Sequence, residues 1–158
     1  MKRFIAQPLT AVLSILVVVA ALSFGSIASA GAAEDVITTK VAGPFDKVVT
    51  NLKRQVAAHK LIIIKLIPFQ QMLRMVGVKA GKAVGFEIFH PRYGKVIFNN
   101  DKRAMIDVPL RMIVRAKGSD VMIMYRKPSA VFAKYSGLGD MAKELDGVFA
   151  DMVKRVAQ

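Results

Sequence analysis

Two arginines in the C-terminal half of the chain have the residue type and spacing most suited to binding chemistry. Arg111 and Arg126 lie at equal sequence distances from the dipeptide Gly118-Ser119. A two-residue turn at this dipeptide predicts a β-hairpin in which Arg111 lies directly opposite Arg126. Two guanidinium groups in such positions repel each other unless an anion lies between them. The spacing therefore predicts either a carboxylate or a bound anion at this end of the hairpin.

The anion has two candidate sources. The first is Glu87. If Val84, Phe86 and Ile88 face the core, the alternation of side chains along this strand leaves the carboxylate of Glu87 on the arginine side. A structural ion cluster of Arg111, Glu87 and Arg126 is the simpler hypothesis, since ionic networks are common in proteins. The second source is a small anionic or amphipathic ligand held by the two arginines on a sheet face that helices leave uncovered. Such a ligand would also contact apolar side chains of that face, namely Ile113, Met122, Met124 and Phe89.

A second copy of the chain is an alternative occupant of the same sheet face. Monomeric proteins rarely leave a large apolar surface exposed to water. A face that is apolar in its middle and cationic at its end is therefore also suited to a dimer interface. We expect a homodimer on this ground.

His90 is a candidate axial ligand for iron. It ends an apolar segment just before Pro91, and it is one of only two histidines in the chain. Haem b can be held by one histidine without covalent attachment, and nearby methionines and arginines would suit its macrocycle and propionates. A lone histidine at the end of a strand more often has a structural, hydrogen-bonded role. Binding of haem b through His90 is therefore an alternative hypothesis to the arginine site.

Two methionine pairs have spacings that could bring thioethers together for Cu(I). These are Met72 with Met75, and Met122 with Met124. Methionine more often fills gaps in a hydrophobic core. A core or gap-filling role is therefore the hypothesis that we favour over a copper site.

The remaining sequence favours a binding domain over an enzyme. The 158 residues include no cysteine, which excludes disulfides, thiolate metal sites and a cysteine nucleophile. They also contain no zinc-binding HExxH, no phosphate loop and no nucleophile elbow. An enzyme whose site carries no recognisable motif remains the alternative.

The N-terminal segment resembles a cleaved secretory signal peptide. It has a basic start at Lys2 and Arg3, an apolar stretch over residues 9–24, and the small residues Ala28-Ser29-Ala30. We predict cleavage after residue 30, a periplasmic or secreted protein, and membrane contact only through this segment if it is retained. The net charge of +13 is compatible with nucleic acid, but export argues against that partner.

Residues 31–158 are predicted to form one α+β domain. An apolar spacing of three to four residues predicts helices, and alternation or β-branched runs predict strands. We expect an antiparallel sheet with two main helices on one face, in a β-α-β-β-β-β-α-like order with short helical segments. The run from Leu61 to Ile67 is expected to be a central or nearly central strand, and residues 129–139 a loop. The expected strands are 36–41, 61–67, 84–90, 110–117 and 121–127, and the expected long helices are 45–58 and one that begins near residue 140.

Four segments of the chain resemble the domain of unknown function 302 family: VGFEIFH, PRYGKVIFNND, DVPLRMIVRAKG and VMIMYRKP. The resemblance extends over about residues 36–156. It implies a small α+β domain that occurs in exported and other bacterial proteins, tends to self-associate and has no established general activity. It also implies a helix over residues 95–100, where periodicity alone fits either a short helix or an irregular turn.

Overall fold

The computed structural model describes residues 35–158, so the predicted signal peptide and its cleavage site lie outside the described residues. Within this range the chain forms five strands, five α-helices and one 3-10 helix, η1. The elements in chain order are β1 (Val36–Val41), α1 (Phe45–Ala58), β2 (Ile62–Ile67), α2 (Phe69–Met75), β3 (Ala83–Phe89), α3 (Pro91–Asn100), η1 (Lys102–Asp107), β4 (Leu110–Lys117), β5 (Asp120–Arg126), α4 (Pro128–Phe132) and α5 (Gly139–Ala157).

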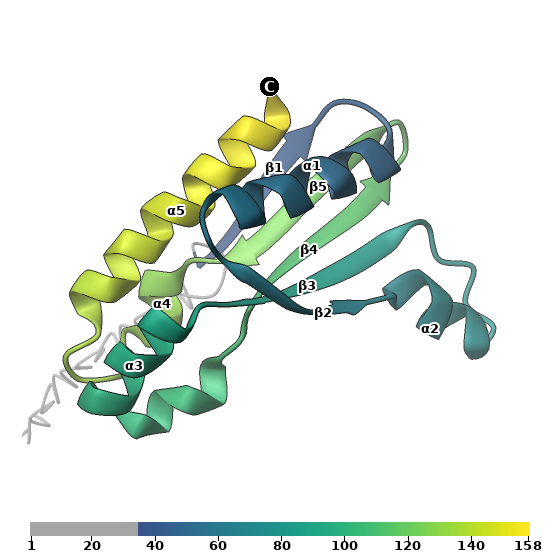
Figure 1. Ribbon diagram of the computed structural model, residues 1–158. Coiled ribbons are helices and arrows are strands. Elements are labelled where there is room, and N and C mark those ends of the chain that lie inside the picture. Colours follow the sequence, from purple (N-terminus) through teal and green to yellow (C-terminus); the bar gives the residue numbers. More distant parts are fainter. Residues whose placement is uncertain (1–34) are drawn as a thin grey trace, which may run out of the picture.

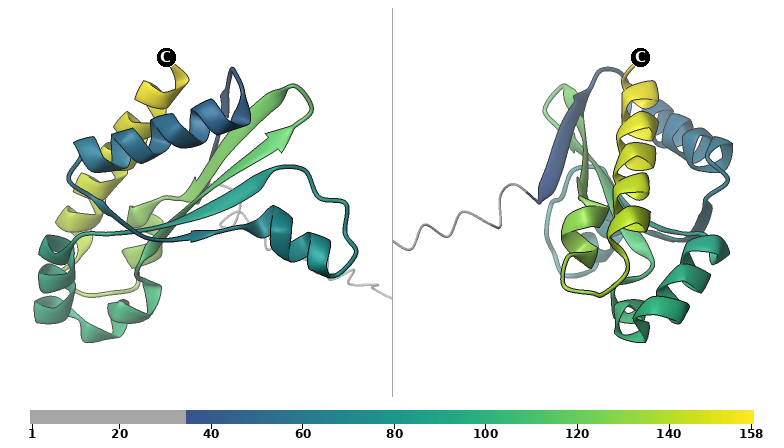
Figure 2. Two further views of the ribbon diagram at one scale, coloured as in Figure 1. Left: turned by 45° about the vertical axis from the view of Figure 1, so that its right-hand side comes forward. Right: turned by 90° about the vertical axis from the view of Figure 1, so that its left-hand side faces the viewer.

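The strands form a single antiparallel sheet in the order β1-β5-β4-β3-β2. The two long helices, α1 and α5, contact each other and cover the same face of this sheet (Figures 1 and 2). The predicted α+β class and the placement of both main helices on one face are therefore confirmed. The opposite face, which we call the free face, is the side on which a ligand was expected.

The hydrophobic core lies between the sheet and the two long helices. Strands β4 and β5 supply alternate residues to it, including Met112, Val114 and Ile123, which are fully buried. Helices α1 and α5 supply Leu52 and Phe149 from their apolar stripes. The residues between the buried positions of β4 and β5 turn toward the free face and stay partly exposed. The turn position and the alternation of side chains along a strand therefore predict correctly which side chains face the helices.

The β4–β5 hairpin has the predicted register. Lys117 pairs with Asp120, and the ladder continues to Met112 opposite Tyr125. Gly118 has a φ of +61°, which is the conformation that the tight turn requires and that glycine adopts without steric cost.

The predicted position of the second strand is wrong. Strand β2 is an edge strand rather than a central one, and it carries exposed apolar side chains at Ile62, Ile64 and Leu66. A continuous β-branched run is typical of a strand buried on both faces, but the same run also occurs where a partner covers an edge. The expectation of a core position for Met72 and Met75 is also wrong, because both side chains are exposed.

Two segments are more helical than periodicity alone indicated. Residues 95–100 belong to α3, as the family resemblance implied, and α3 begins directly after His90. Residues 128–132 form α4 instead of a loop, and this short helix packs against α5.

Candidate ligand-binding pocket

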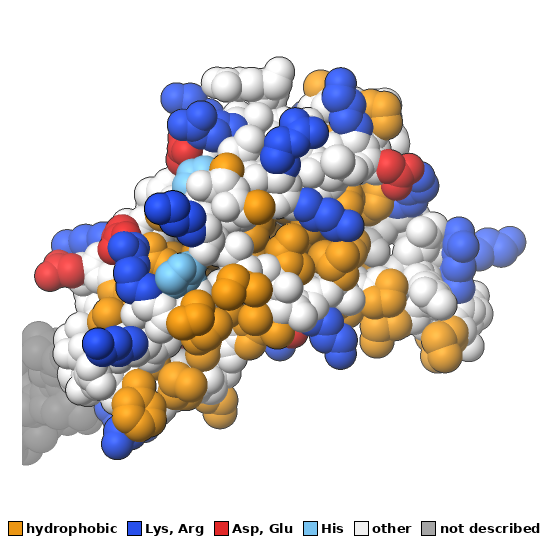
Figure 3. Space-filling view, in the orientation of Figure 1, with side chains coloured by type: hydrophobic (Ala, Val, Ile, Leu, Met, Phe, Trp, Pro, Cys, Tyr) orange, Lys and Arg blue, Asp and Glu red, His pale blue; other side chains and the backbone are white. Residues whose placement is uncertain are grey.

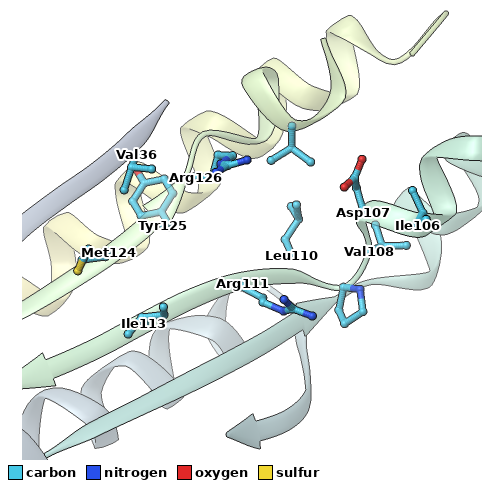
Figure 4. Close-up of a pocket in the computed structure, with 12 residues that line it drawn as sticks. Val36, Ile106, Asp107, Val108, Leu110, Arg111, Ile113, Met124, Tyr125 and Arg126 are labelled. Carbon is cyan, nitrogen blue, oxygen red and sulfur yellow. The ribbon is translucent and has the colours of Figure 1, made fainter. Parts of the chain in front are cut away.

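A pocket of about 410 Å³ opens where β4 begins and β5 ends. This volume is within the range of small-molecule sites, roughly 300–1,000 Å³. Figure 4 shows Arg126 on the β5 side, Arg111 on the β4 side and Leu110 between them. The complete lining is Val36, Ile106, Asp107, Val108, Pro109, Leu110, Arg111, Ile113, Met124, Tyr125, Arg126 and Val131.

The two arginines are separated rather than paired. The β4–β5 ladder ends with Met112 opposite Tyr125, one position before Arg111 and Arg126 would meet. On its other side, Arg126 lies opposite Val36 of β1. The pocket opens at this end of the ladder, with Arg111 and Arg126 on its two walls (Figure 4).

Of the predicted ion cluster, only the pair of Glu87 and Arg111 is present. It lies opposite Arg111 in the β3–β4 ladder, and its Oε1 accepts a hydrogen bond from Arg111 Nε at 3.3 Å. The glutamate side chain is 16% exposed and the arginine side chain 68% exposed, so the carboxylate is the more enclosed partner. Among residues 35–158, no acidic side chain lies within ion-pair distance of Arg126. Arg126 is therefore the cation of the pocket that is available to an anion.

Asp107 adds a carboxylate to the pocket wall, but neighbouring groups already hold it. Tyr135 donates a hydrogen bond to Asp107 Oδ2 at 2.6 Å, and Lys134 Nζ lies 3.2 Å from the same oxygen. The bond from Tyr135, followed by the pairing with Lys134, keeps the pKa of Asp107 below its usual range despite partial burial. The same bond raises the pKa of the Tyr135 hydroxyl. Asp107 is thus an ionised carboxylate that is already partnered. The positive charge of Arg126 also helps to lower the pKa of Asp107, although the two side chains form no ion pair.

Four of the predicted ligand contacts line this pocket: Arg111, Arg126, Ile113 and Met124. Met122 lies on the same face farther along β5, opposite Arg115 and Lys40, and does not line it. Glu87 holds Arg111 from the side of β3.

Phe89 lies apart from the other predicted contacts. Its ring contacts the backbone of Gly94 in α3, where an added Cβ would lie 2.5 Å from a ring carbon. The side chain lines a different hollow, together with His90. The structure therefore does not bring Phe89 to the arginines.

Sequence reasoning missed the wall formed by residues 106–109 and Val131. The segment Asp107-Val108-Pro109 lies directly before β4 and was noted only as part of a family motif. The signal that could have drawn attention to it is a carboxylate two residues before a proline that directly precedes a strand. Val131 lies in α4, which was expected to be a loop.

His90 has a structural role in this fold. Its Nδ1 accepts a hydrogen bond from the backbone N–H of Arg92 at 2.9 Å and so caps the N-terminus of α3. Its ring also packs edge-on against Tyr93. The hollow beside it has about 20 Å³ of free volume, close to that of a single water molecule and far below the size of a macrocycle. Haem b therefore does not fit beside His90 in this conformation, and the two arginines line another pocket.

The family of the chain follows from comparison with known proteins. Residues 37–157 match the family described as "Domain of unknown function DUF302". The chain belongs to this family. The resemblance expected from the sequence is thereby confirmed, and the DUF302 match covers all eleven elements of the structure except the first residue of β1.

A solved DUF302 structure has the same fold. It is the crystal structure of an uncharacterized conserved protein DUF302 from Bacillus stearothermophilus, with a TM-score of 0.73 at 15% sequence identity. The similarity covers 78% of this chain and 99% of that one. No curated protein matches the chain. The comparisons therefore establish family and fold, and the pocket must be interpreted from its own residues.

Two kinds of feature are absent from residues 35–158. No helix in this range combines the length and the apolar character needed to cross a bilayer. The same residues contain no group of three or more histidine, cysteine or acidic side chains placed to hold a metal ion.

Proposed function

We propose that this DUF302 protein is an exported, non-enzymatic domain that binds a small anionic or amphipathic ligand in the pocket between β4 and β5. The observation that carries the proposal is the position of Arg126, an exposed guanidinium without an acidic partner among residues 35–158, at the edge of a pocket of about 410 Å³. Arg111 adds a second cation on the opposite wall. Export to the periplasm or the medium is part of the proposal and is supported by the N-terminal sequence.

The walls of the pocket favour an amphipathic anion over a simple inorganic one. Ile113, Met124 and Leu110 supply apolar surface close to the two arginines. A carboxylate could accept charge-assisted hydrogen bonds from a guanidinium while its hydrocarbon part contacts these side chains. Both contributions act together only when the charged and apolar parts of a ligand are covalently joined.

Octanoate is a suitable probe, and titration calorimetry measures its binding directly. Octanol and octylammonium are matched controls, because they keep the hydrocarbon chain but lack the negative charge. A charge-assisted hydrogen bond contributes about 1.5–3 kcal/mol, so Arg126→Gln should weaken octanoate binding at least tenfold. Arg115→Gln is the control variant, since Arg115 lies on the same face but does not line the pocket. Equal affinities for octanoate and octanol, or equal effects of the two variants, would contradict the proposal.

The homodimer expected from the sequence also remains a proposal, but the structure favours a different surface for it. Ile113, Met122 and Met124 of the free face are only partly exposed, whereas Ile62, Ile64 and Leu66 of the edge strand β2 are exposed. An edge strand has unpaired backbone groups, and two copies of β2 can pair antiparallel about a two-fold axis. The exposed apolar side chains of β2 support this arrangement.

Light scattering after size-exclusion chromatography tests the dimer. Ile64→Lys places a charge in the proposed interface and should reduce the molar mass from that of two chains to that of one. Ile106→Lys is the control, because Ile106 is an exposed isoleucine of η1, far from β2 in the chain. A dimer that persists in the Ile64 variant, or a wild-type monomer, would contradict this surface.

A further inference from the structure

The segment 71–79 forms a projecting tip in which every residue is exposed. It contains most of α2 and the turn that follows, and Figures 1 and 2 show it away from α1, α3 and α5. Helix α2 has no buried residue. We call residues 71–79 the α2 tip. An ordered segment in which no residue is buried needs a reason for its apolar composition.

The apolar side chains of the α2 tip are among the most exposed in the described part of the chain. Met75 is 81% exposed and Val76 is 74% exposed. Met72, Leu73 and Val78 are exposed as well. Contiguous exposed apolar side chains on a soluble domain are typical of a surface that meets another apolar phase.

The charges around the α2 tip have one sign. Between Asp46 and Glu87 the sequence has eight lysines and arginines and no acidic residue. Arg74 and Lys79 belong to the tip itself and line an open hollow at its end. Neither has an ion-pair partner within residues 35–158. Figure 3 shows cationic and hydrophobic side chains together at this end of the molecule.

The α2 tip is fixed to the body of the protein. Phe69, the first residue of α2, packs against Gly85 of β3, where an added Cβ would lie 2.7 Å from the phenyl ring. The side chain of Gln70 donates a hydrogen bond to the carbonyl of Ala80 at 3.3 Å and so closes the base of the tip. The apolar side chains are thus held outward by two contacts that leave the tip itself without a partner.

We propose that the α2 tip docks on a bilayer rich in anionic phospholipid. Met72, Met75, Val76 and Val78 enter the boundary between headgroups and acyl chains, and Arg74 and Lys79 bind lipid phosphates. Apolar side chains surrounded by unpaired cations match the layered chemistry of an anionic membrane surface. A nucleic acid would offer no apolar layer for the methionines, and a second copy would bring the same cations into contact. This proposal departs from the expectation that only the signal segment touches the membrane, and it is independent of the pocket between β4 and β5.

A local fluorescence measurement tests the docking in the full chain, where the N-terminal apolar segment could bind membranes by itself. The chain has no cysteine, so Gln71→Cys gives a single attachment site for the environment-sensitive dye NBD at the tip. Asn99→Cys is the matched control, an exposed polar position on α3. Vesicles of phosphatidylglycerol and phosphatidylcholine should shift the emission of NBD to shorter wavelength at position 71 and leave it unchanged at position 99.

Substitutions within the α2 tip separate the apolar contribution to membrane binding from the electrostatic one. With NBD at position 71, Met75→Asp combined with Val76→Asp should abolish the shift. Arg74→Gln or Lys79→Gln should each raise the lipid concentration at half-maximal shift about fivefold, as expected for one basic side chain near an anionic surface. Vesicles of phosphatidylcholine alone should give a much weaker shift.

Three results would overturn the proposal. The first is the absence of a vesicle-dependent shift at position 71. The second is an equal shift at positions 71 and 99, which would mean that another segment holds the protein at the bilayer. The third is a shift at position 71 that grows with protein concentration without vesicles, which would mean that a second copy covers the tip.

Discussion

The β4–β5 hairpin and the β2–α2 segment are both apolar stretches with isolated basic residues, yet they differ in how far their apolar side chains are buried. In the hairpin, alternate side chains such as Met112 and Ile123 are fully buried beneath the helices. In β2 and α2, Ile64 and Met75 are exposed. The difference lies in the position of the strands, because β4 and β5 are central in the sheet and lie beneath helices, whereas β2 is an edge strand.

This contrast shows what apolar composition does and does not determine. Alternation with a period of two assigns one face to the core and the other to solvent, so it fixes the orientation of a strand. A continuous apolar run fits burial on both faces and also fits an edge that awaits a partner. The inward side chains of β4 and β5 are therefore covered within the chain, whereas the composition of β2 and α2 points to contacts outside it.

The largest expected effect compares two isoleucines, one from each region. Ile123→Ala should lower the free energy of unfolding by about 2–5 kcal/mol, because it leaves a cavity in the core beneath α1 and α5. Ile64→Ala removes the same atoms from a side chain that is 54% exposed and should change stability by less than about 0.5 kcal/mol in the monomer. Urea denaturation monitored by circular dichroism measures both. Similar losses would mean that β2 is buried in solution and that the contrast does not hold.

The sequence predicted the fold to the extent that its patterns had a single physical interpretation. The helix over residues 45–58 and the hairpin register agree with the structure, because local periodicity and turn chemistry determine them. The edge position of β2 could not be predicted, since strand order depends on long-range pairing that a single segment does not encode. The pocket could be predicted only in part. Arg111 and Arg126 lie on its two walls, as their spacing indicated, but the position of residues 106–109 depends on how the chain folds back after α3.

An intermediate effect concerns the contact that anchors α2 to β3. Gly85→Ala places a methyl group against the ring of Phe69, and overpacking of this kind costs about 1–3 kcal/mol. The ring should move away from β3, and amide hydrogen exchange in residues 69–75 should become faster than in β4. Combining Gly85→Ala with Phe69→Leu should restore part of the stability. Gly147→Ala is the control, since its added methyl meets no atom within 4 Å in α5. Unchanged exchange in α2 would show that Phe69 does not anchor the α2 tip.

The smallest expected effect on stability comes from Glu87→Gln. This change tests whether the anion near the arginines is Glu87 itself or a bound ligand. Glu87→Gln removes the ion pair with Arg111, whose guanidinium is largely in solvent, so the free energy of unfolding should fall by less than about 1 kcal/mol. The same change frees Arg111 for a ligand, and octanoate should bind severalfold more tightly, because the carboxylate that competes for this guanidinium is gone. Calorimetry and urea denaturation on the same protein give both quantities. A large loss of stability without a gain in affinity would show that the arginine and glutamate form a structural cluster. A gain in affinity at little cost in stability would instead mean that the pair contributes little to the fold and that Glu87 competes with a ligand for Arg111.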